Sequence, residues 1–356
     1  MQVSFILPIL NEQVFISDTL KSILNQKKSN DWQFEILISD GGSTDGTLEI
    51  INTIILNNSN IHLIDNPQKM VSTGFNLALN KANGEIIIRV DGHCEIPKNY
   101  IENCCKLLEK TNADIVGGVI ETISSGLIGN AISISQSSGF GVGGVRFRNK
   151  DSKKAGYVNT LAFGAHRREI FADIGGYDEE MVRNQDDEFN HRALQARKKI
   201  WMDPTVKTIY YARSNYLKLF KQYFNYGFYK VRGIQKRGEV VSISHIIPSI
   251  FIVTLIITLI IGFFLQLPLV TFFVVFLYLL FNLSASIYSA SSIRVFPLIS
   301  LAFWTLHLGY GLGFIWGLIR FLNKWNDTEL KDFNFNRKIF CANNSKQDKS
   351  IEDSIS

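Results

Sequence analysis

Asp91, Gly92 and His93 are the residues of this sequence whose types and spacing most directly suggest chemistry. The preceding run, Glu85 to Val90, is apolar and rich in β-branched side chains, and it follows the chain breaker Asn83-Gly84, which predicts a strand. In an open α/β sheet, ligands bind just beyond the carboxyl ends of the strands. A carboxylate and an imidazole at that place could coordinate one divalent cation, and the cation could hold a diphosphate. The alternative is a common Asp-Gly turn followed by a surface histidine.

Two other predicted strands also end in polar residues. The strand from Val3 to Pro8 is followed by Asn11 and Glu12, and the strand from Glu35 to Asp40 runs into a glycine-rich turn. Helical patterns separate the predicted strands, over residues 14–24, 47–56 and 74–81. This alternation predicts an α/β fold with a parallel sheet and crossover helices. The polar strand ends should therefore converge on one rim of the sheet.

Composition excludes several classes of protein. The length of 356 residues allows about two domains, and the net charge of +5 comes without a block of lysines, so a nucleic-acid partner is not favoured. The GxGxxG and GxxxxGK[ST] motifs are absent, which disfavours dehydrogenases and P-loop nucleotidases. The cysteines show no CxxC spacing, which fits a reducing compartment. They are Cys94, Cys104, Cys105 and Cys341.

Three motifs in combination resemble a known family. The stretches Pro8 to Glu12, Asp40 to Gly46 and Asp91 to His93 are similar to the signature of the family-two glycosyltransferases with the GT-A fold. The run from Asn66 to Asn76, followed by Asp91-Gly92-His93-Cys94, resembles the membrane-attached branch of succinoglycan and other exopolysaccharide biosynthesis. The resemblance covers residues 1–240. It implies a GT-A catalytic domain there, with a Rossmann-like, mixed and mostly parallel sheet.

The resemblance also implies a set of site residues. The donor would be a nucleotide-sugar, with a UDP-sugar expected, and a divalent cation, Mn²⁺ or Mg²⁺, would be held by Asp91 and His93. His93 stands where the family's DxD-type motif has its last aspartate, and imidazole suits Mn²⁺ better than Mg²⁺. The expected donor-binding residues lie near the strand ends. They are Pro8, Asn11, Glu12, Asp40, Ser43, Lys69, Asn76 and Asp91.

Structural interpretations remain open for three of these residues. Ser43 could cap the helix that follows it, and Lys69 could be a solvated loop lysine. Glu12 could be a first-turn acid that interacts with a helix dipole.

The acidic run Asp186-Asp187-Glu188 resembles the family's E-D-x-[DE] motif, with Gln185 in place of the glutamate. The resemblance implies that Asp186 is the general base. Inverting transfer needs one base to take the proton from the acceptor hydroxyl as it attacks the anomeric carbon, while a metal can stabilise the leaving diphosphate. The alternative is a helix N-terminus, where negative charge is favourable by about 0.3–1 kcal/mol. Glu188 and Arg192 have the spacing of a structural i,i+4 pair.

Two further features lie between residues 124 and 168. The segment from Ser124 to Asn149 is rich in Gly and Ser, which predicts a mobile loop over the acceptor. His166 could belong equally to the scaffold or to a substrate contact.

The composition changes after residue 240. Residues 245–320 are almost free of charge and predict about three transmembrane helices, each long enough for a ~30 Å hydrocarbon core. The first two runs, joined by Gln266-Leu267-Pro268, could instead form a re-entrant pair. Residues 215–238 are aromatic and basic, which is typical of an interfacial helix, although a helix closing the catalytic domain is the alternative. Residues 321–356 form a polar tail, with 341–356 expected to be disordered.

The sequence as a whole favours a membrane-anchored enzyme. We expect an inverting, metal-dependent glycosyltransferase that moves a sugar from a nucleotide-sugar to a lipid-linked saccharide or a growing exopolysaccharide or cell-surface glycan. Its partners would be the donor, the lipid-linked acceptor and membrane lipids. The expected place is the cell membrane, as a multi-pass protein with a cytoplasmic catalytic domain, because nucleotide-sugars are cytoplasmic. The alternatives are a polyprenyl-phosphate sugar synthase and a non-catalytic membrane scaffold.

Overall fold

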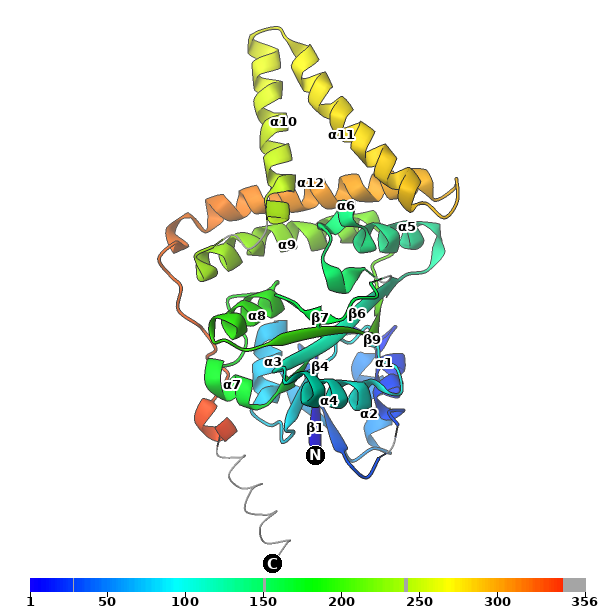
Figure 1. Ribbon diagram of the computed structural model, residues 1–356, viewed down its shortest axis with the longest axis vertical. Coiled ribbons are helices and arrows are strands. Elements are labelled where there is room, and N and C mark those ends of the chain that lie inside the picture. The colour runs from blue at the N-terminus through cyan, green and yellow to red at the C-terminus, as the bar shows by residue number, and fades with distance from the viewer. Residues whose placement is uncertain (28, 150–151, 240–242, 342–356) are drawn as a thin grey trace, which may run out of the picture. The chain divides into compact units, whose positions relative to one another are not determined.

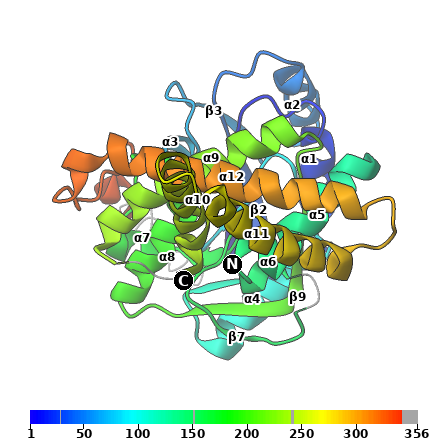
Figure 2. The ribbon, with the colours of Figure 1, turned by 90° about the horizontal axis from the view of Figure 1, so that it is seen from above.

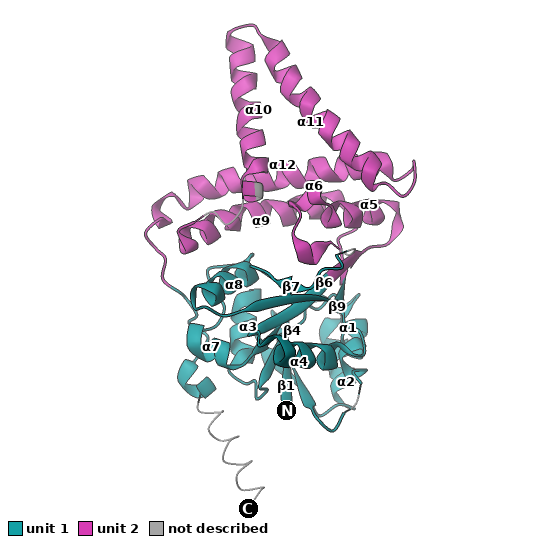
Figure 3. Ribbon diagram, in the orientation of Figure 1, with its two compact units in different colours: residues 1–119, 152–209, 330–356 teal, residues 120–151, 210–329 magenta. Residues whose placement is uncertain are grey.

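The computed structural model describes residues 1–27, 29–149, 152–239 and 243–341 (Figure 1). The chain divides into two compact units (Figure 3). The first, called here the sheet unit, comprises residues 1–119, 152–209 and 330–356, and the second, the helical unit, comprises residues 120–151 and 210–329. The tail residues 342–356, which were expected to be disordered, lie outside the described residues.

Among the described residues, nine strands form one sheet in the order β3-β2-β1-β4-β8-β6-β9-β5, with β7 pairing with β9. The first four strands are parallel to one another: β1 (Gln2–Ile9), β2 (Gln33–Asp40), β3 (Ile61–Asp65) and β4 (Ile86–Arg89). They alternate with the helices α1 (Ile16–Leu24), α2 (Thr47–Ile55) and α3 (Val71–Leu79). Strand β8 (Ala165–Arg167) is antiparallel to both β4 and β6 (Ile115–Ile123). The predicted mixed, mostly parallel α/β sheet is confirmed.

The remaining elements of the sheet unit follow β4. They are β5 (Cys94–Glu95), α4 (Tyr100–Thr111), β7 (Gly156–Tyr157), α7 (Glu169–Ile174), α8 (Gln185–Gln195) and β9 (Ile200–Tyr211). Strands β6 and β9 each continue for a few residues into the helical unit.

Strand β1 lies at the centre of the parallel part of the sheet. Its residues from Val3 to Ile9 are all buried, which explains why they are apolar, apart from Ser4, rather than alternating between apolar and polar. Pro8 was expected to end this strand, but β1 continues to Ile9, and Pro8 pairs in register with Ser39 of β2. The chain that leads into β4 approaches β1 closely at Gly84, where a Cβ would lie 2.4 Å from the backbone nitrogen of Ser4, so a side chain there would clash.

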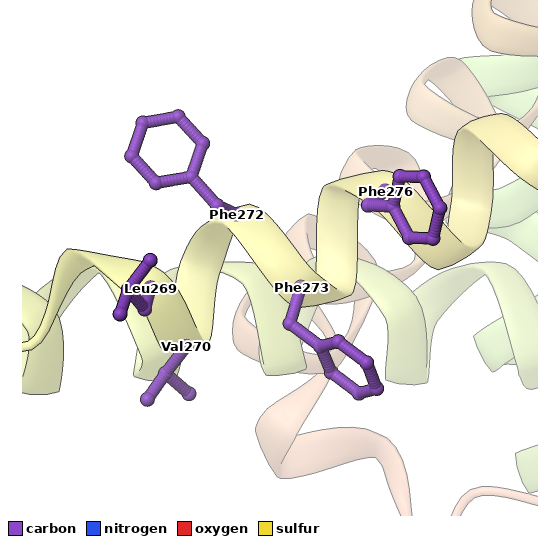
Figure 4. A pocket seen from close by; sticks show the side chains of 5 residues that line it. All are labelled: Leu269, Val270, Phe272, Phe273 and Phe276. Carbon is purple, nitrogen blue, oxygen red and sulfur yellow. The ribbon is translucent and has the colours of Figure 1, made fainter.

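The helical unit begins with two short helices, α5 (Gly126–Ser137) and α6 (Gly139–Val142), in the segment that was expected to be a mobile loop. The long helices are α9 (Tyr216–Arg237), α10 (Ile247–Phe264), α11 (Pro268–Ser289) and α12 (Phe296–Arg320). In the described part of the chain, α10, α11 and α12 are long and apolar enough to cross a membrane. A shallow apolar hollow on α11 is lined by Leu269, Val270, Phe272, Phe273 and Phe276 (Figure 4).

Part of the expected polar tail belongs to the sheet unit. Phe335 and Phe340 are buried, and the buried Arg168 donates a hydrogen bond of 2.9 Å to the carbonyl oxygen of Phe340. The Arg168 guanidinium carbon also lies 3.8 Å from the centre of the Phe340 ring, a cation–π geometry. Residues 330–341 are therefore anchored to the sheet unit, although only their polar composition was evident in the sequence.

Candidate active site

The loops that follow β1 and β2 are joined by backbone-to-side-chain hydrogen bonds. The amide of Asn11 donates to Ser43 Oγ at 2.9 Å, and the amide of Thr44 donates to Asn11 Oδ1 at 2.8 Å. The amide of Glu12 donates to Thr47 Oγ1 at 2.8 Å. Asn11 has a φ of 56°, a conformation that asparagine adopts more readily than most residues. The ends of these two strands thus form one ordered rim.

Asp40 shapes the second of these loops. Its Oδ2 accepts hydrogen bonds from the amides of Gly42 and Ser43, at 2.9 and 3.0 Å, and its Oδ1 accepts one from Ser43 Oγ at 2.6 Å. The carboxylate is therefore committed to its own turn. The exposed Lys69 approaches the same turn, since a Cβ at Gly42 would lie 3.8 Å from Lys69 Nζ.

The turn after β4 is connected to this rim through His93. Its Nδ1 lies 2.8 Å from Glu12 Oε1, and both side chains are largely buried. Gly92 permits the approach, because a Cβ there would lie 2.7 Å from Glu12 Cγ. The polar ends of β1, β2 and β4 therefore meet, as the parallel sheet predicts.

Arg89, the last residue of β4, holds Asp91 from inside the protein. Its Nη2 and Nε atoms donate to Asp91 Oδ1 at 2.8 and 3.2 Å. The guanidinium carbon lies 5.8 Å from the ring centre of Phe163 and 5.7 Å from that of Tyr177. Burial opposes the positive charge, but Asp91, Tyr177 and Asp186 outweigh burial and raise the pKa of Arg89. This arginine stays charged at any pH at which the protein is folded.

Asp186 lies in the first turn of α8 and belongs to the same electrostatic cluster. Burial raises the pKa of its carboxyl group, Arg89 opposes that shift, and the negative charges of Asp187 and Asp91 add to it. Asp186 Oδ1 accepts a hydrogen bond of 3.0 Å from the amide of Asp187. A carboxyl group whose pKa is raised toward the working pH is a better proton acceptor than an ordinary aspartate.

Comparisons with known proteins show the family to which this chain belongs. The sequence profile of the family described as "Glycosyl transferase family 2" matches residues 4–174. The succinoglycan biosynthesis protein ExoA of Rhizobium meliloti is 30% identical over 249 residues, which cover 68% of this chain and 73% of that protein. The chain belongs to glycosyl transferase family 2. The mixed sheet described above is accordingly its GT-A-type fold.

More distant relatives of this family 2 chain extend the comparison. A Methanococcus voltae protein, named dolichyl N-acetyl-alpha-D-glucosaminyl phosphate 3-beta-D-2,3-diacetamido-2,3-dideoxy-beta-D-glucuronosyltransferase, is 26% identical over 326 residues, which cover 89% of this chain and 97% of that protein. Among solved structures, S. aureus TarS 1-349 in complex with UDP has a TM-score of 0.48 at 16% identity and covers 92% of each chain.

Two predicted donor-binding residues of this glycosyltransferase lie away from the polar rim. Pro8 is buried inside β1. Asn76 is fully buried in α3, where its Nδ2 donates to the carbonyl oxygen of Tyr177 and to Glu179 Oε1, each at 2.8 Å, and its Oδ1 accepts from the amide of Tyr177 at 2.8 Å. Asn76 positions the segment that carries Tyr177, which in turn packs against Arg89. The expected contact of Asn76 with the donor stays a prediction.

His166 and the pair of Glu188 with Arg192 belong to the scaffold. His166 is buried, and burial lowers the pKa of its imidazole to about 4, so the ring is neutral. Arg192 Nε lies 2.6 Å from Glu188 Oε1, as the i,i+4 spacing predicts. Arg192 also donates to the carbonyl oxygen of Gly176 at 2.7 Å, which ties α8 to the loop that leads to Tyr177.

The two side chains predicted to hold the divalent cation, those of Asp91 and His93, already contact other residues of the protein. Arg89 occupies Asp91 Oδ1, and Glu12 faces His93 Nδ1. Within the residues that the structure describes, no group of at least three His, Cys, Asp or Glu side chains could hold a metal ion. Asp91 and His93 stay predicted ligands, and a cation held by these two side chains would need further ligands, such as the phosphates of a substrate.

Arg89 and Tyr177 are the residues that sequence reasoning missed. An arginine within the apolar run Ile86-Ile87-Ile88-Arg89-Val90 is the signal that could have revealed the first, because buried cations are almost always paired. No comparable signal marks Tyr177, whose place depends on residues far away in the sequence.

Proposed function

We propose that this chain is an inverting glycosyltransferase that moves a sugar from a nucleotide-sugar, a UDP-sugar in the first instance, to a lipid-linked saccharide or a growing exopolysaccharide or cell-surface glycan. The observation that carries the proposal is the cluster of Asp186, Arg89 and Asp91. It combines a carboxyl group of raised pKa with a second carboxylate held by a buried arginine. In a chain of this family, that arrangement supports proton abstraction beside a bound pyrophosphate.

The rim formed by the β1 and β2 loops would hold the donor. Asn11, Glu12 and Ser43 lie there, and Lys69 approaches the turn shaped by Asp40. These loops are ordered by their own hydrogen bonds, so little ordering would be required when the nucleoside binds. Asp91 and His93 would hold the cation, which supplies charge stabilisation to the departing diphosphate.

Asp186 would perform the proton transfer. Its carboxylate takes the proton from the acceptor hydroxyl while that oxygen forms a bond to the anomeric carbon of the donor. The bond between the anomeric carbon and the diphosphate oxygen breaks on the opposite side, and the nucleoside diphosphate leaves with the bonding electrons. One base and one displacement give inversion at the anomeric carbon.

Two separate observations support the proposal that the acceptor is bound to the membrane. Helices α10, α11 and α12 are apolar enough to enter a membrane, and two relatives carry names that refer to an exopolysaccharide and to a dolichyl-linked sugar. In this proposal, residues 1–240 carry the catalysis, and residues 245–320 attach the enzyme to the cell membrane. The catalytic residues face the cytoplasm, where nucleotide-sugars are found.

The test is a transfer assay with the full-length protein in membranes. A panel of nucleotide-sugars is supplied together with lipid-linked saccharides or with a polyprenyl phosphate, and the anomeric configuration of the product is determined by NMR. We expect an inverted glycosidic linkage on a saccharide hydroxyl. Transfer to the phosphate alone would support the polyprenyl-phosphate sugar synthase, and retention of configuration would contradict the mechanism.

A further inference from the structure

Helices α9 and α12 of the helical unit lie side by side, and both views show this (Figures 1 and 2). Three glycines of α12, spaced four residues apart, face three phenylalanines of α9 with the same spacing. A Cβ on each glycine would lie 2.9, 2.0 and 2.6 Å from a phenylalanine carbonyl oxygen, in the pairs Gly309 with Phe220, Gly313 with Phe224 and Gly317 with Phe228. The two backbones therefore approach as closely as small residues allow.

The two helices also run in the same direction and are tied at both ends. Near the start of each, Tyr216 donates a hydrogen bond of 3.0 Å to the carbonyl oxygen of Leu298. Beyond the end of α12, Asp327 accepts from Arg232 Nη2, at 2.8 Å through its carbonyl oxygen and 3.1 Å through Oδ2. Because the register is constant over the paired glycines, the axis of α12 must share the orientation of α9 relative to a membrane.

Helix α9 lacks the apolar length needed to cross a bilayer. It carries six basic residues, and the uncharged stretch between Lys221 and Lys230 runs from Gln222 to Tyr229. That stretch is about 12 Å long at ~1.5 Å per residue, less than half of a ~30 Å hydrocarbon core. Its aromatic and basic composition suits the headgroup region. Helix α12, paired along α9, would then lie in the same region.

The course of the chain leads to the same conclusion independently. The chain leaves the sheet unit after residue 209, and residues from 330 onward belong to the sheet unit again. The amide of Glu179 donates to the carbonyl oxygen of Lys331 at 2.7 Å, and Arg168 donates to that of Phe340 at 2.9 Å. A chain that starts and ends on one face of a membrane crosses it an even number of times, whereas three spans would be an odd number.

Helices α10 and α11 form a hairpin that satisfies this requirement. The amide of Leu267 donates to the carbonyl oxygen of Gly262 at 3.0 Å, and Thr271 Oγ1 donates to that of Thr258 at 2.8 Å. The helices contain 18 and 22 residues, which correspond to about 27 and 33 Å. Most of α11 is exposed and apolar, including the residues that line the hollow in Figure 4.

We propose that this protein enters the bilayer through the α10–α11 hairpin, returns to the same face, and keeps α12 beside α9 in the headgroup region. The partner of the exposed apolar hairpin is the hydrocarbon of the lipid bilayer. This proposal does not depend on the proposed reaction, and its test requires no activity.

The first experiment asks whether the parts of the sheet unit before and after the helical unit lie on the same face of the membrane. Cys94, Cys104 and Cys105 are buried, whereas Cys341 is exposed at the end of the described chain. In sealed vesicles of known orientation, a membrane-impermeant maleimide should label Cys341 and Lys106→Cys, on the exposed side of α4, from the same face.

The Cys341→Ser variant provides the background for that experiment. In it, Lys338→Cys reports on the same segment through a second exposed position. Labelling of the α4 position and the C-terminal positions from opposite faces would establish an odd number of crossings and overturn the proposal.

The second experiment measures depth along α12. Spin labels at Leu301→Cys, Leu312→Cys and Ile319→Cys occupy exposed positions of this helix. For a helix lying in the interface, the three labels should have equal depths, about 5–10 Å below the surface. For a spanning helix, their positions along the membrane normal would differ by up to about 27 Å. Depths that change steadily along α12 would contradict the proposal.

A matched series on α11 serves as the control for depth. Labels at Leu269→Cys, Leu280→Cys and Ile287→Cys are also exposed. Their positions along the membrane normal should differ by up to about 27 Å, with Leu280 nearest the centre of the bilayer. A flat profile on α11 as well would show that the hairpin does not enter the bilayer, which also overturns the proposal.

Discussion

The guanidinium of Arg89 lies against one oxygen of Asp91, with Nη2 at 2.8 Å and Nε at 3.2 Å from Oδ1. The arginine is buried beneath the site, and one-fifth of the Asp91 side chain is exposed, at 20%. Arg89 is therefore a positioning residue: it orients a carboxylate that would face the ligand and also influences the carboxyl group of Asp186.

The Asp186→Asn variant should abolish transfer. Asparagine has nearly the same shape but cannot accept the acceptor's proton, so kcat should fall by about 10²–10⁴-fold. Donor binding, measured by calorimetry, should change little, because Asp186 is assigned to the acceptor side. Asp187→Asn is the matched control and should keep most of the activity. A variant Asp186→Asn that retained more than about a tenth of the wild-type kcat would remove the base assignment and favour a phosphate acceptor, which needs little base catalysis.

The pH dependence of kcat should carry the signature of Asp186. Burial raises the pKa of this carboxyl group above its usual value, and the charge of Asp187 raises it further. The base works when it is deprotonated, so kcat should rise with pH through this raised pKa. Asp187→Asn removes a neighbouring negative charge, lowers the pKa of Asp186 and should move the acidic limb of the profile to lower pH. An acidic limb that stays in place, or moves upward, would show that another group controls it.

The Arg89→Met variant should destabilise the protein and disorder the site. It leaves the partly buried Asp91 without its partner, and breaking a buried ion pair in this way costs about 3–5 kcal/mol. The lower end of that range is expected, since Asp91 remains 20% exposed. Chemical unfolding of the purified protein in detergent measures the loss. Arg89→Lys should recover only part of it, because lysine cannot form the two-pronged contact. Equal stability of the wild type and both variants would show that the ion pair between Arg89 and Asp91 does not stabilise the protein.

The rim of the sheet was predictable because each element carried a local signal. The apolar strands that end at Asp40 and Arg89 are separated by helical patterns, and parallel strands bring their carboxyl ends to one edge. The role of Asn76 was not predictable, because it depends on Tyr177, 101 residues away in the sequence. The segment after residue 124 was misjudged for a related reason: glycine and serine predict a loop, whereas helix α5 packs against α12, whose contacts no local pattern reveals.

The burial of two phenylalanines in the expected polar tail was also not predictable from the sequence. Phe335 and Phe340 lie in a stretch of mostly polar residues, where isolated aromatic side chains are common on protein surfaces. Their burial depends on partners such as Arg168, 172 residues before Phe340. Long-range contacts of this kind decide the course of the chain, and composition alone does not contain them.

Cation binding should depend on the nucleotide. In the proposed site, Asp91 and His93 would supply an incomplete set of ligands, and Arg89 already neutralises much of the charge on Asp91. We therefore expect calorimetry to show weak binding of Mn²⁺ alone and much tighter binding in the presence of UDP, whose phosphates complete the coordination. Asp91→Asn should lower the nucleotide-dependent affinity for Mn²⁺ by about 10–100-fold, the loss typical of disturbed metal sites. The control is Asp173→Asn, a half-exposed residue of α7, which should bind as the wild type does. Tight Mn²⁺ binding without UDP, or binding unaffected by Asp91→Asn, would place the cation elsewhere in the protein.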